Sequence, residues 1–255
     1  MIYEFICWIF FYSVIGWIYE SILCSVSERR WINRGFLNGP YCLVYGFGAV
    51  LNILIMDGIN NIFILFYLST VTACTLEYFT SWLMEKLFQA RWWDYSGHKY
   101  NLNGRISLEG AIVFGTFSVL LIRLIHPEAM HLTNTLSDTM VRSIAYFILI
   151  VIAIDCIITV VNVQGFNRKL RLADTRLQIT KIRLQLSEIK SMITELNLQE
   201  IRILRAFPKL KSILYDDALQ LIKKAFKNTI WGKPQQMISE VILSRNSSFY
   251  NRSES

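Results

Sequence analysis

The stretch from Asn33 to Gly48, NRGFLNGPYCLVYGFG, is the part of the chain that best indicates the fold. Asn38-Gly39-Pro40 has the composition of a helix start, with Asn as the N-cap and Pro in the first turn. The residues that follow are small or polar-tipped, although they lie within an apolar run. Small residues allow close approach of a neighbouring backbone, and a helix N-terminus presents unpaired N–H groups. We therefore expect a tightly packed helix whose polar start faces a polar partner.

Composition places the chain among membrane proteins. Of its 255 residues, 53% are hydrophobic and 14% aromatic, more than a soluble domain of this size can bury. The net charge of +7 is uneven, because residues 166–255 hold 17 of the 26 Lys and Arg but only 8 of the 19 acids. A basic tail after an apolar region indicates a cytoplasmic location near anionic lipid, not nucleic-acid binding.

Five apolar segments are long enough to span a bilayer, which takes about 20 residues each. They cover residues 3–25, 37–56, 61–85, 106–126 and 139–163. The first has no basic leader and no cleavage site, so we expect it to be retained as a span. Basic residues gather in the links after the first, third and fifth segments. The positive-inside rule then predicts an outside N-terminus and an inside C-terminus.

Glu20, Glu77, Glu109 and Asp155 lie within the spans, each in the half that this topology places near the cytoplasm. Charges at that depth usually face a protein interior or a wet cavity. The second span adds Asn38 at the same level, and Arg34 and Arg105 are the expected counter-charges. We therefore predict a polar pocket in the cytoplasmic half of the bundle. The alternative is that these acids pair with Arg, Trp and Tyr to stabilise helix packing.

The link between the third and fourth spans contains Arg91-Trp-Trp-Asp-Tyr-Ser96 and Asn101-Leu-Asn-Gly-Arg105. Its Trp and Tyr side chains suit the membrane interface. Asn103-Gly104 is a turn signal, and Arg105 can share a helix face with Glu109. Asp94 and Asn103 join the pocket residues as binding candidates. No Ser/His/Asp arrangement or second nearby His accompanies His98, so we predict no catalytic residue, no metal site and no cofactor. A membrane-embedded enzyme is not excluded.

Three separated motifs resemble the ABC-transporter permease family of the CmpB type, found in Gram-positive bacteria. They are Gly16-Trp17-Ile-Tyr19-Glu20, the segment Asn33–Gly48, and Trp93-Asp-Tyr-Ser96 with Asn101-Leu-Asn-Gly-Arg-Ile-Ser-Leu108. The likeness covers residues 3 to about 165. It implies a multi-pass permease subunit of the cell membrane that works with a separate ATP-binding subunit. Family members often have Cys-Pro where this chain has Cys42-Leu43, which puts kink-dependent gating in doubt.

The remainder of the chain is predicted to be helical and charged. We expect a five-helix transmembrane domain at 1–165, a cytoplasmic helical hairpin or coiled coil at 166–231, and a mostly disordered tail at 232–255. Apolar residues at steps of three and four between 167 and 205 suit self-association, and a second amphipathic helix is expected from Lys209 to Ile230. That basic helix suits a helical hairpin with a solvated basic face, which is the favoured interpretation. The alternatives are an anionic membrane surface and a partner groove.

Two functions from different classes fit these observations. The first is a transport subunit whose acidic pocket favours a cationic or polyhydroxyl solute. The second is a membrane-anchored interaction or scaffold protein that acts through its cytoplasmic helical tail.

Overall fold

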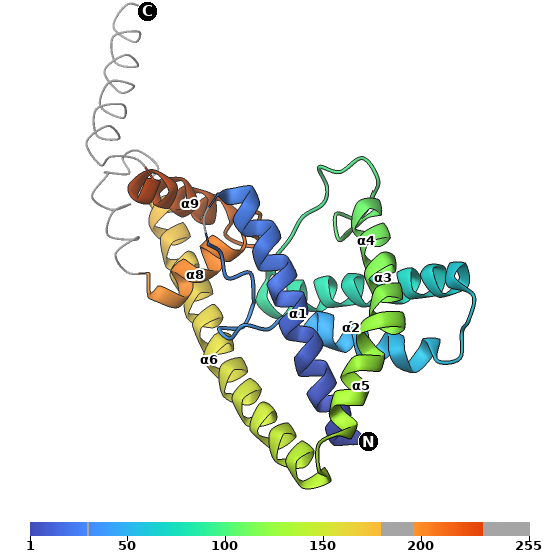
Figure 1. The fold of residues 1–255 in the computed structure, drawn as a ribbon. Coiled ribbons are helices and arrows are strands. Elements are labelled where there is room, and N and C mark those ends of the chain that lie inside the picture. Colours follow the sequence, from blue (N-terminus) through green and yellow to red (C-terminus); the bar gives the residue numbers. More distant parts are fainter. Residues whose placement is uncertain (30, 180–195, 232–255) are drawn as a thin grey trace, which may run out of the picture. The chain divides into compact units, whose positions relative to one another are not determined.

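The computed structural model describes residues 1–29, 31–179 and 196–231 (Figure 1). Within these residues, four helices are long and apolar enough to cross a membrane. They are α1 (Ile2–Glu28), α3 (Ile62–Phe88), a continuous helix made of α4 (Leu108–Leu120), η1 (Leu121–Ile125) and α5 (His126–Asn134), and α6 (Asp138–Ile179). The prediction of an all-α polytopic membrane protein is confirmed.

The predicted second span at 37–56 is wrong in its bounds. Helix α2 runs from Leu43 to Met56 and has Cys42, not Asn38, at its N-cap. Its 14 residues extend about 21 Å at the usual helical rise, less than the roughly 30 Å of a bilayer core. Asn38 and Gly39 stay outside the helix because both donate hydrogen bonds to Asp155 on α6. A tertiary contact thus replaces the predicted cap.

The structure divides into two compact units. The first contains residues Met1–Gly165 and Leu198–Ile213, and the second contains Phe166–Asn197 and Leu214–Ser255. The segment 198–213, which the sequence assigned to the cytoplasmic tail, therefore groups with the transmembrane helices. In the second unit, Phe166, Leu170 and Ala173 recur on one side of α6 and are buried. Residues 180–195 and 232–255 lie outside the described residues. These ranges contain much of the apolar pattern predicted between 167 and 205 and the whole predicted disordered tail.

Helices α1 and α2 cross with their backbones in close contact (Figure 1). A Cβ atom added to Gly46 would lie 2.1 Å from the carbonyl oxygen of Ile9 and 2.2 Å from Oγ of Ser13. The backbone N–H of Cys42 donates to the carbonyl of Ser13 at 2.9 Å. The expectation of a tightly packed small-residue helix is thus met, with α1 as its neighbour.

The third long helix, α4–η1–α5, continues through residues that were predicted to form a link. Pro127 has no N–H, so the usual helical bond to the carbonyl of Arg123 cannot form, and the chain widens into the π-helical turn η1 just before it. Tyr12 bonds Nδ1 of His126 at 2.8 Å, and Trp8 donates to Thr133 at 2.9 Å. Packing against α1 therefore keeps this segment helical.

Two short antiparallel pairs lie outside the long helices. β2 (Asn101–Leu102) pairs with β3 (Ile106–Ser107), and the Asn103-Gly104 turn predicted from the sequence joins them. β1 (Ala90–Arg91) pairs with β4 (Lys211–Ser212), which follows α8 (Leu198–Ala206). Because Lys211 and Ser212 are in a strand, helix α9 (Asp216–Trp231) begins later than the predicted Lys209.

Candidate functional site

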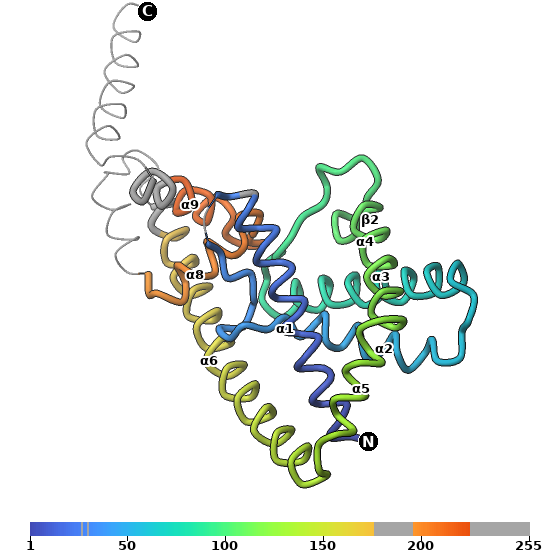
Figure 2. The backbone as a smooth tube through the Cα atoms, viewed as in Figure 1, coloured from blue at the N-terminus to red at the C-terminus, as the bar shows by residue number. Residues whose placement is uncertain are grey.

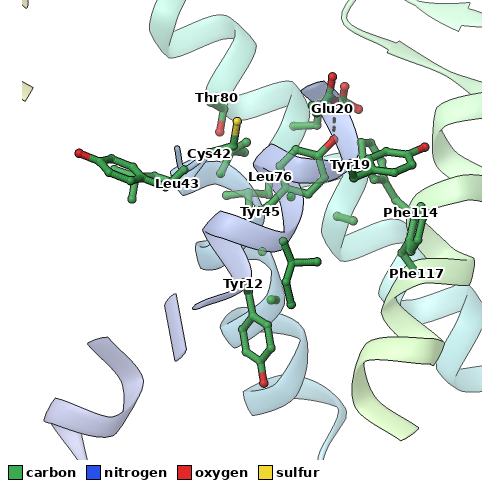
Figure 3. Close-up of a pocket in the computed structure, with 18 of the residues that line it drawn as sticks. Tyr12, Tyr19, Glu20, Cys42, Leu43, Tyr45, Leu76, Thr80, Phe114 and Phe117 are labelled. Atoms are coloured by element: carbon green, nitrogen blue, oxygen red, sulfur yellow. Dashed lines mark hydrogen bonds between the residues drawn. The ribbon is translucent and has the colours of Figure 1, made fainter. Parts of the chain in front are cut away.

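A cavity of about 470 Å³ lies among α1, α2, α3 and the α4–η1 helix. Its walls are mainly apolar, and Tyr19, Phe114 and Phe117 gather along one side of it (Figure 3). The π-helical turn contributes Leu121 and Ile125. Three of the nine predicted binding residues line it: Glu20, Arg34 and Glu77.

Glu20 has two polar partners. Tyr45 donates its hydroxyl to Oε1 of Glu20 at 2.5 Å, the contact drawn as a dashed line in Figure 3. Nε of Arg34 lies 3.6 Å from Oε2 of the same carboxylate. The ring of Tyr45 reaches Glu20 across α1 because Gly16 leaves room, since a Cβ there would lie 2.3 Å from the Tyr45 ring. Arg34 therefore lies close enough to Glu20 to act as its counter-charge.

Glu77 differs from Glu20 because its carboxylate has no cationic partner among the described residues. Its side chain is 9% exposed, and Oε2 has no hydrogen-bond partner among those residues. Tyr95 interacts electrostatically with Glu77 from the loop that follows β1. Burial raises the pKa of Tyr95, and the nearby Glu77 and Glu20 carboxylates raise it further, so its phenol stays protonated and can donate. Glu77 is therefore a buried acid with unused acceptor capacity.

Asp155 and Asn38 lie together, but neither is among the residues that line the cavity. The Asp155 carboxylate accepts hydrogen bonds from the backbone N–H of Asn38 at 3.0 Å, the side-chain amide of Asn38 at 2.7 Å, the backbone N–H of Gly39 at 2.8 Å and the hydroxyl of Tyr41 at 2.6 Å. Thr159, one turn further along α6, donates to it at 3.2 Å. With five donors, this carboxylate holds the 31–42 loop to α6.

Arg105 and Asn103 connect the loop after α3 to α3 itself. Nη2 of Arg105 lies 2.8 Å from Oε2 of Glu85, and Nη1 donates to Ser81 at 3.1 Å. Asn103 donates to the hydroxyl of Tyr78 at 3.0 Å. Arg105, a predicted counter-charge for the pocket acids, thus pairs with Glu85 instead. Glu85 was not among the predicted binding residues.

Glu109 lies apart from the other predicted residues. Its side chain is 81% exposed, and its carboxylate contacts Nδ1 of His98 at 3.0 Å. The prediction that Arg105 and Glu109 share a helix face is wrong because α4 begins at Leu108, after Arg105.

Trp92 was expected at the membrane interface, yet it is buried against Phe36, Phe88 and Phe207. Phe207 belongs to the segment 198–213, whose residues could not be assigned to this site from the sequence.

The segment 198–213 is hydrogen-bonded to the 31–42 loop through Arg34 and Arg202. The backbones of the two segments can be followed in Figure 2. Arg202 donates to the carbonyls of Gly35 at 2.7 Å, Phe36 at 2.9 Å and Leu37 at 2.9 Å. Arg34 donates in return to the carbonyl of Ala206, and its guanidinium lies 4.5 Å from the centre of the Phe207 ring. Phe207 also lines the cavity, so this segment forms part of the cavity wall.

Asp94 anchors the far end of the same segment. Nζ of Lys211 lies 2.6 Å from Oδ2 of Asp94, and the backbone N–H of Ser96 donates to Oδ1 at 3.0 Å. Burial alone would raise the pKa of Asp94, but Lys211 and Ser96 outweigh it and lower that pKa well below its usual range. The carboxylate therefore stays ionised and paired at neutral pH.

Replacing Arg202 by alanine is expected to release the segment 198–213. The change removes three charge-assisted hydrogen bonds and leaves three carbonyls without that donor, at a cost of about 1.5–3 kcal/mol for a single bond of this kind. Amide hydrogen exchange across 203–213 should accelerate at least about tenfold. The exposed Lys209→Ala variant is the control and should exchange like the wild type. Unchanged exchange in Arg202→Ala would contradict the assignment.

The sequence carried only partial signals for the residues that were missed. Glu77, Ser81 and Glu85 follow one another at four-residue steps, which places them along one side of α3 and could have identified Glu85. Arg202 and Lys211 gave no such signal, because their partners lie more than 100 residues earlier in the chain.

Among the described residues, no group of three or more His, Cys, Asp and Glu side chains is placed to hold a metal ion.

A family model described as "ABC_trans_CmpB: Putative ABC-transporter type IV" matches residues 7–160. No curated protein and no solved structure matches the chain. The matched range includes most of α1 and all of α2, α3 and α4, which surround the cavity, and it ends before the segment 198–213.

Proposed function

Because the chain belongs to the CmpB-type family of ABC transporters, we propose that it is the permease subunit of such a transporter. In this proposal it crosses the cell membrane several times with its C-terminus in the cytoplasm. Solute passes through the cavity lined by Glu20, Arg34 and Glu77, and a separate subunit hydrolyses ATP.

One observation carries the proposal: charged side chains from three separate elements meet at one cavity inside an otherwise apolar helix bundle. Glu20 comes from α1, Arg34 from the 31–42 loop and Glu77 from α3. Ionisable groups among membrane-spanning helices are costly and commonly mark a substrate or ion pathway. All three residues lie within the part of the chain that the family model matches.

A separate ATP-binding subunit is proposed because residues 1–255 contain no phosphate-binding motif of the G-x-x-x-x-G-K-S/T type. A second copy of this chain, bound through residues 167–205, stays a prediction, and much of that range lies outside the described residues.

Purification of the tagged full chain from its native membranes in mild detergent tests the partnership. We expect an ATP-binding polypeptide to elute with it in constant ratio, together with vanadate-sensitive ATP hydrolysis. A folded, monodisperse chain that elutes alone and without ATP hydrolysis would contradict the proposal.

Charge-neutralising variants test the pathway in inside-out membrane vesicles. Glu20→Gln and Glu77→Gln are expected to reduce ATP-dependent accumulation of the transported solutes, measured by mass spectrometry of the vesicle contents, by about tenfold or more. Glu128→Gln, an exposed acid on α5, is the matched control and should accumulate solutes normally. Equal accumulation in all three variants at equal expression would reject the cavity as the pathway.

The alternative function, a membrane-anchored scaffold acting through the tail, is distinguished by truncation. Residues 198–213 group with the transmembrane helices, so the deletion should remove only 214–255. Retained transport in that variant favours the cavity, whereas a folded membrane domain without activity favours the tail.

A further inference from the structure

Two hydrogen-bond acceptors on residues that line the cavity are left without donors among the described residues. Oε2 of Glu77 is one, and Oδ1 of Asn52, on α2, is the other. Both side chains are at least nine-tenths buried, with exposed fractions of 9% and 2%, and both line the cavity. A buried acceptor without a donor costs free energy, so such atoms mark a place where a donor from outside the chain can bind.

The carboxyl group of Glu77 has no cationic partner among the described residues close to the cavity. Arg34 is the one Lys or Arg among the described residues that line it, and its guanidinium is already held by Glu20, the carbonyl of Ala206 and the Phe207 ring. A ligand at Glu77 is therefore expected to bring positive charge and N–H donors together.

The mainly apolar walls of the cavity indicate that the remainder of the ligand is apolar. Phe114, Phe117, Leu76 and Ile15 present hydrocarbon, and the hydroxyl of Tyr45 is already bonded to Glu20. A polyhydroxyl solute would lose its hydrogen bonds to water without replacing them here. The volume of about 470 Å³ lies in the range of small-molecule sites. Aromatic rings around a cation add a favourable cation–π contribution.

We infer that the cavity binds an amphipathic organic cation: a protonated amine joined to an apolar body. The ammonium group would donate to Glu77 and Asn52, and the apolar body would pack between Phe114 and Phe117. The inference rests on the proposed function, since it names the solute class of the same cavity, and it selects the cation from the two solute classes that the sequence favoured.

Calorimetric titration of the detergent-purified full chain tests the solute class with three matched probes. 3-Phenylpropylammonium carries the charge, 3-phenylpropanol is a neutral analogue, and 3-phenylpropionate carries the opposite charge. We expect the ammonium to bind and the alcohol and carboxylate to bind at least about tenfold more weakly, because each lacks the charge-assisted bond to Glu77. Equal binding of the alcohol or the carboxylate, or no binding of the ammonium, would overturn the inference.

Variants separate binding at Glu77 from a structural effect. Glu77→Gln should weaken ammonium binding at least about tenfold while its melting temperature stays close to or above that of the wild type, because glutamine keeps one acceptor oxygen and no cationic partner of Glu77 is lost among the described residues. Glu128→Gln should bind like the wild type. Ala73→Leu, which places a larger side chain in the cavity wall, should reduce binding although Glu77 is present. Undiminished binding in both Glu77→Gln and Ala73→Leu would place the probe elsewhere and overturn the inference.

This titration requires neither an ATP-binding partner nor transport. If the ammonium binds in the predicted way but no ATPase co-purifies and vesicle accumulation does not depend on Glu77, the proposed function fails and the binding site stands. If transport depends on Glu77 but the carboxylate probe binds best, the solute class fails and the permease assignment stands.

Discussion

Gly46→Ala is expected to destabilise the transmembrane domain by about 3 kcal/mol, the upper end of the usual cost of overpacking. The added methyl group would lie 2.1 Å from the carbonyl oxygen of Ile9 and 2.2 Å from Oγ of Ser13. The Ile9 oxygen belongs to the backbone of α1, so the clash cannot be relieved by rotating a side chain. Helices α1 and α2 must separate, which opens one wall of the cavity. Thermal unfolding of the purified chain in detergent measures the loss.

Gly48→Ala, on the same helix, is the matched control. Its new Cβ would contact only Cδ2 of Leu76 at 3.2 Å, the flexible end of a side chain. Because alanine is favoured over glycine within a helix by roughly 0.5–1 kcal/mol, this variant should be neutral or slightly stabilised. If Gly46→Ala melted at the same temperature as Gly48→Ala, the close approach of α1 and α2 would be wrong.

Asp155→Ala should cost about 3 kcal/mol or more, since each buried donor left without an acceptor costs about 1–3 kcal/mol. The variant removes the common acceptor of Asn38, Gly39, Tyr41 and Thr159. Asp155→Asn keeps one acceptor oxygen but turns an amide N–H₂ toward donors, so an intermediate loss is expected. Chemical or thermal unfolding in detergent ranks the three proteins.

Thr159→Val, which removes one donor and leaves the carboxylate in place, should cost only about 1 kcal/mol. Hydrogen exchange of the 31–42 loop provides a second measurement, because the loop should exchange faster in Asp155→Ala and not in Thr159→Val. A stable Asp155→Ala variant with a protected loop would show that other contacts hold this loop.

Asp155 and Glu77 look alike in the sequence, although one is fully hydrogen-bonded in the structure and the other is not. Both are acidic residues within apolar segments, and the topology predicted from the sequence places both near the same side of the membrane. In the structure Asp155 accepts five hydrogen bonds, whereas Glu77 keeps one oxygen without a donor among the described residues. We therefore expect opposite effects of neutralisation: lost stability at Asp155, and lost binding with retained stability at Glu77.

The all-α membrane class and the long helices could be predicted from the sequence because both depend on local composition. Apolar runs of about 20 residues identify membrane helices whatever their neighbours are, and the Asn103-Gly104 turn follows from the freedom of those two residues to adopt positive φ. The start of α2 could not be predicted in this way. Asn38-Gly39-Pro40 has the local chemistry of a helix cap, but the Asp155 carboxylate, 117 residues after Asn38, accepts hydrogen bonds from the N–H groups of Asn38 and Gly39.

The sequence by itself determined an all-α membrane protein, its family and the presence of acids within apolar segments, since each of these is written in composition or in short motifs. Tertiary structure alone decided which acids share the cavity, that Arg105 pairs with Glu85, and that Phe207 closes part of the cavity wall. The physical reason is that charge pairing and burial depend on distances between residues far apart in the chain, and those distances exist only after the helices have packed.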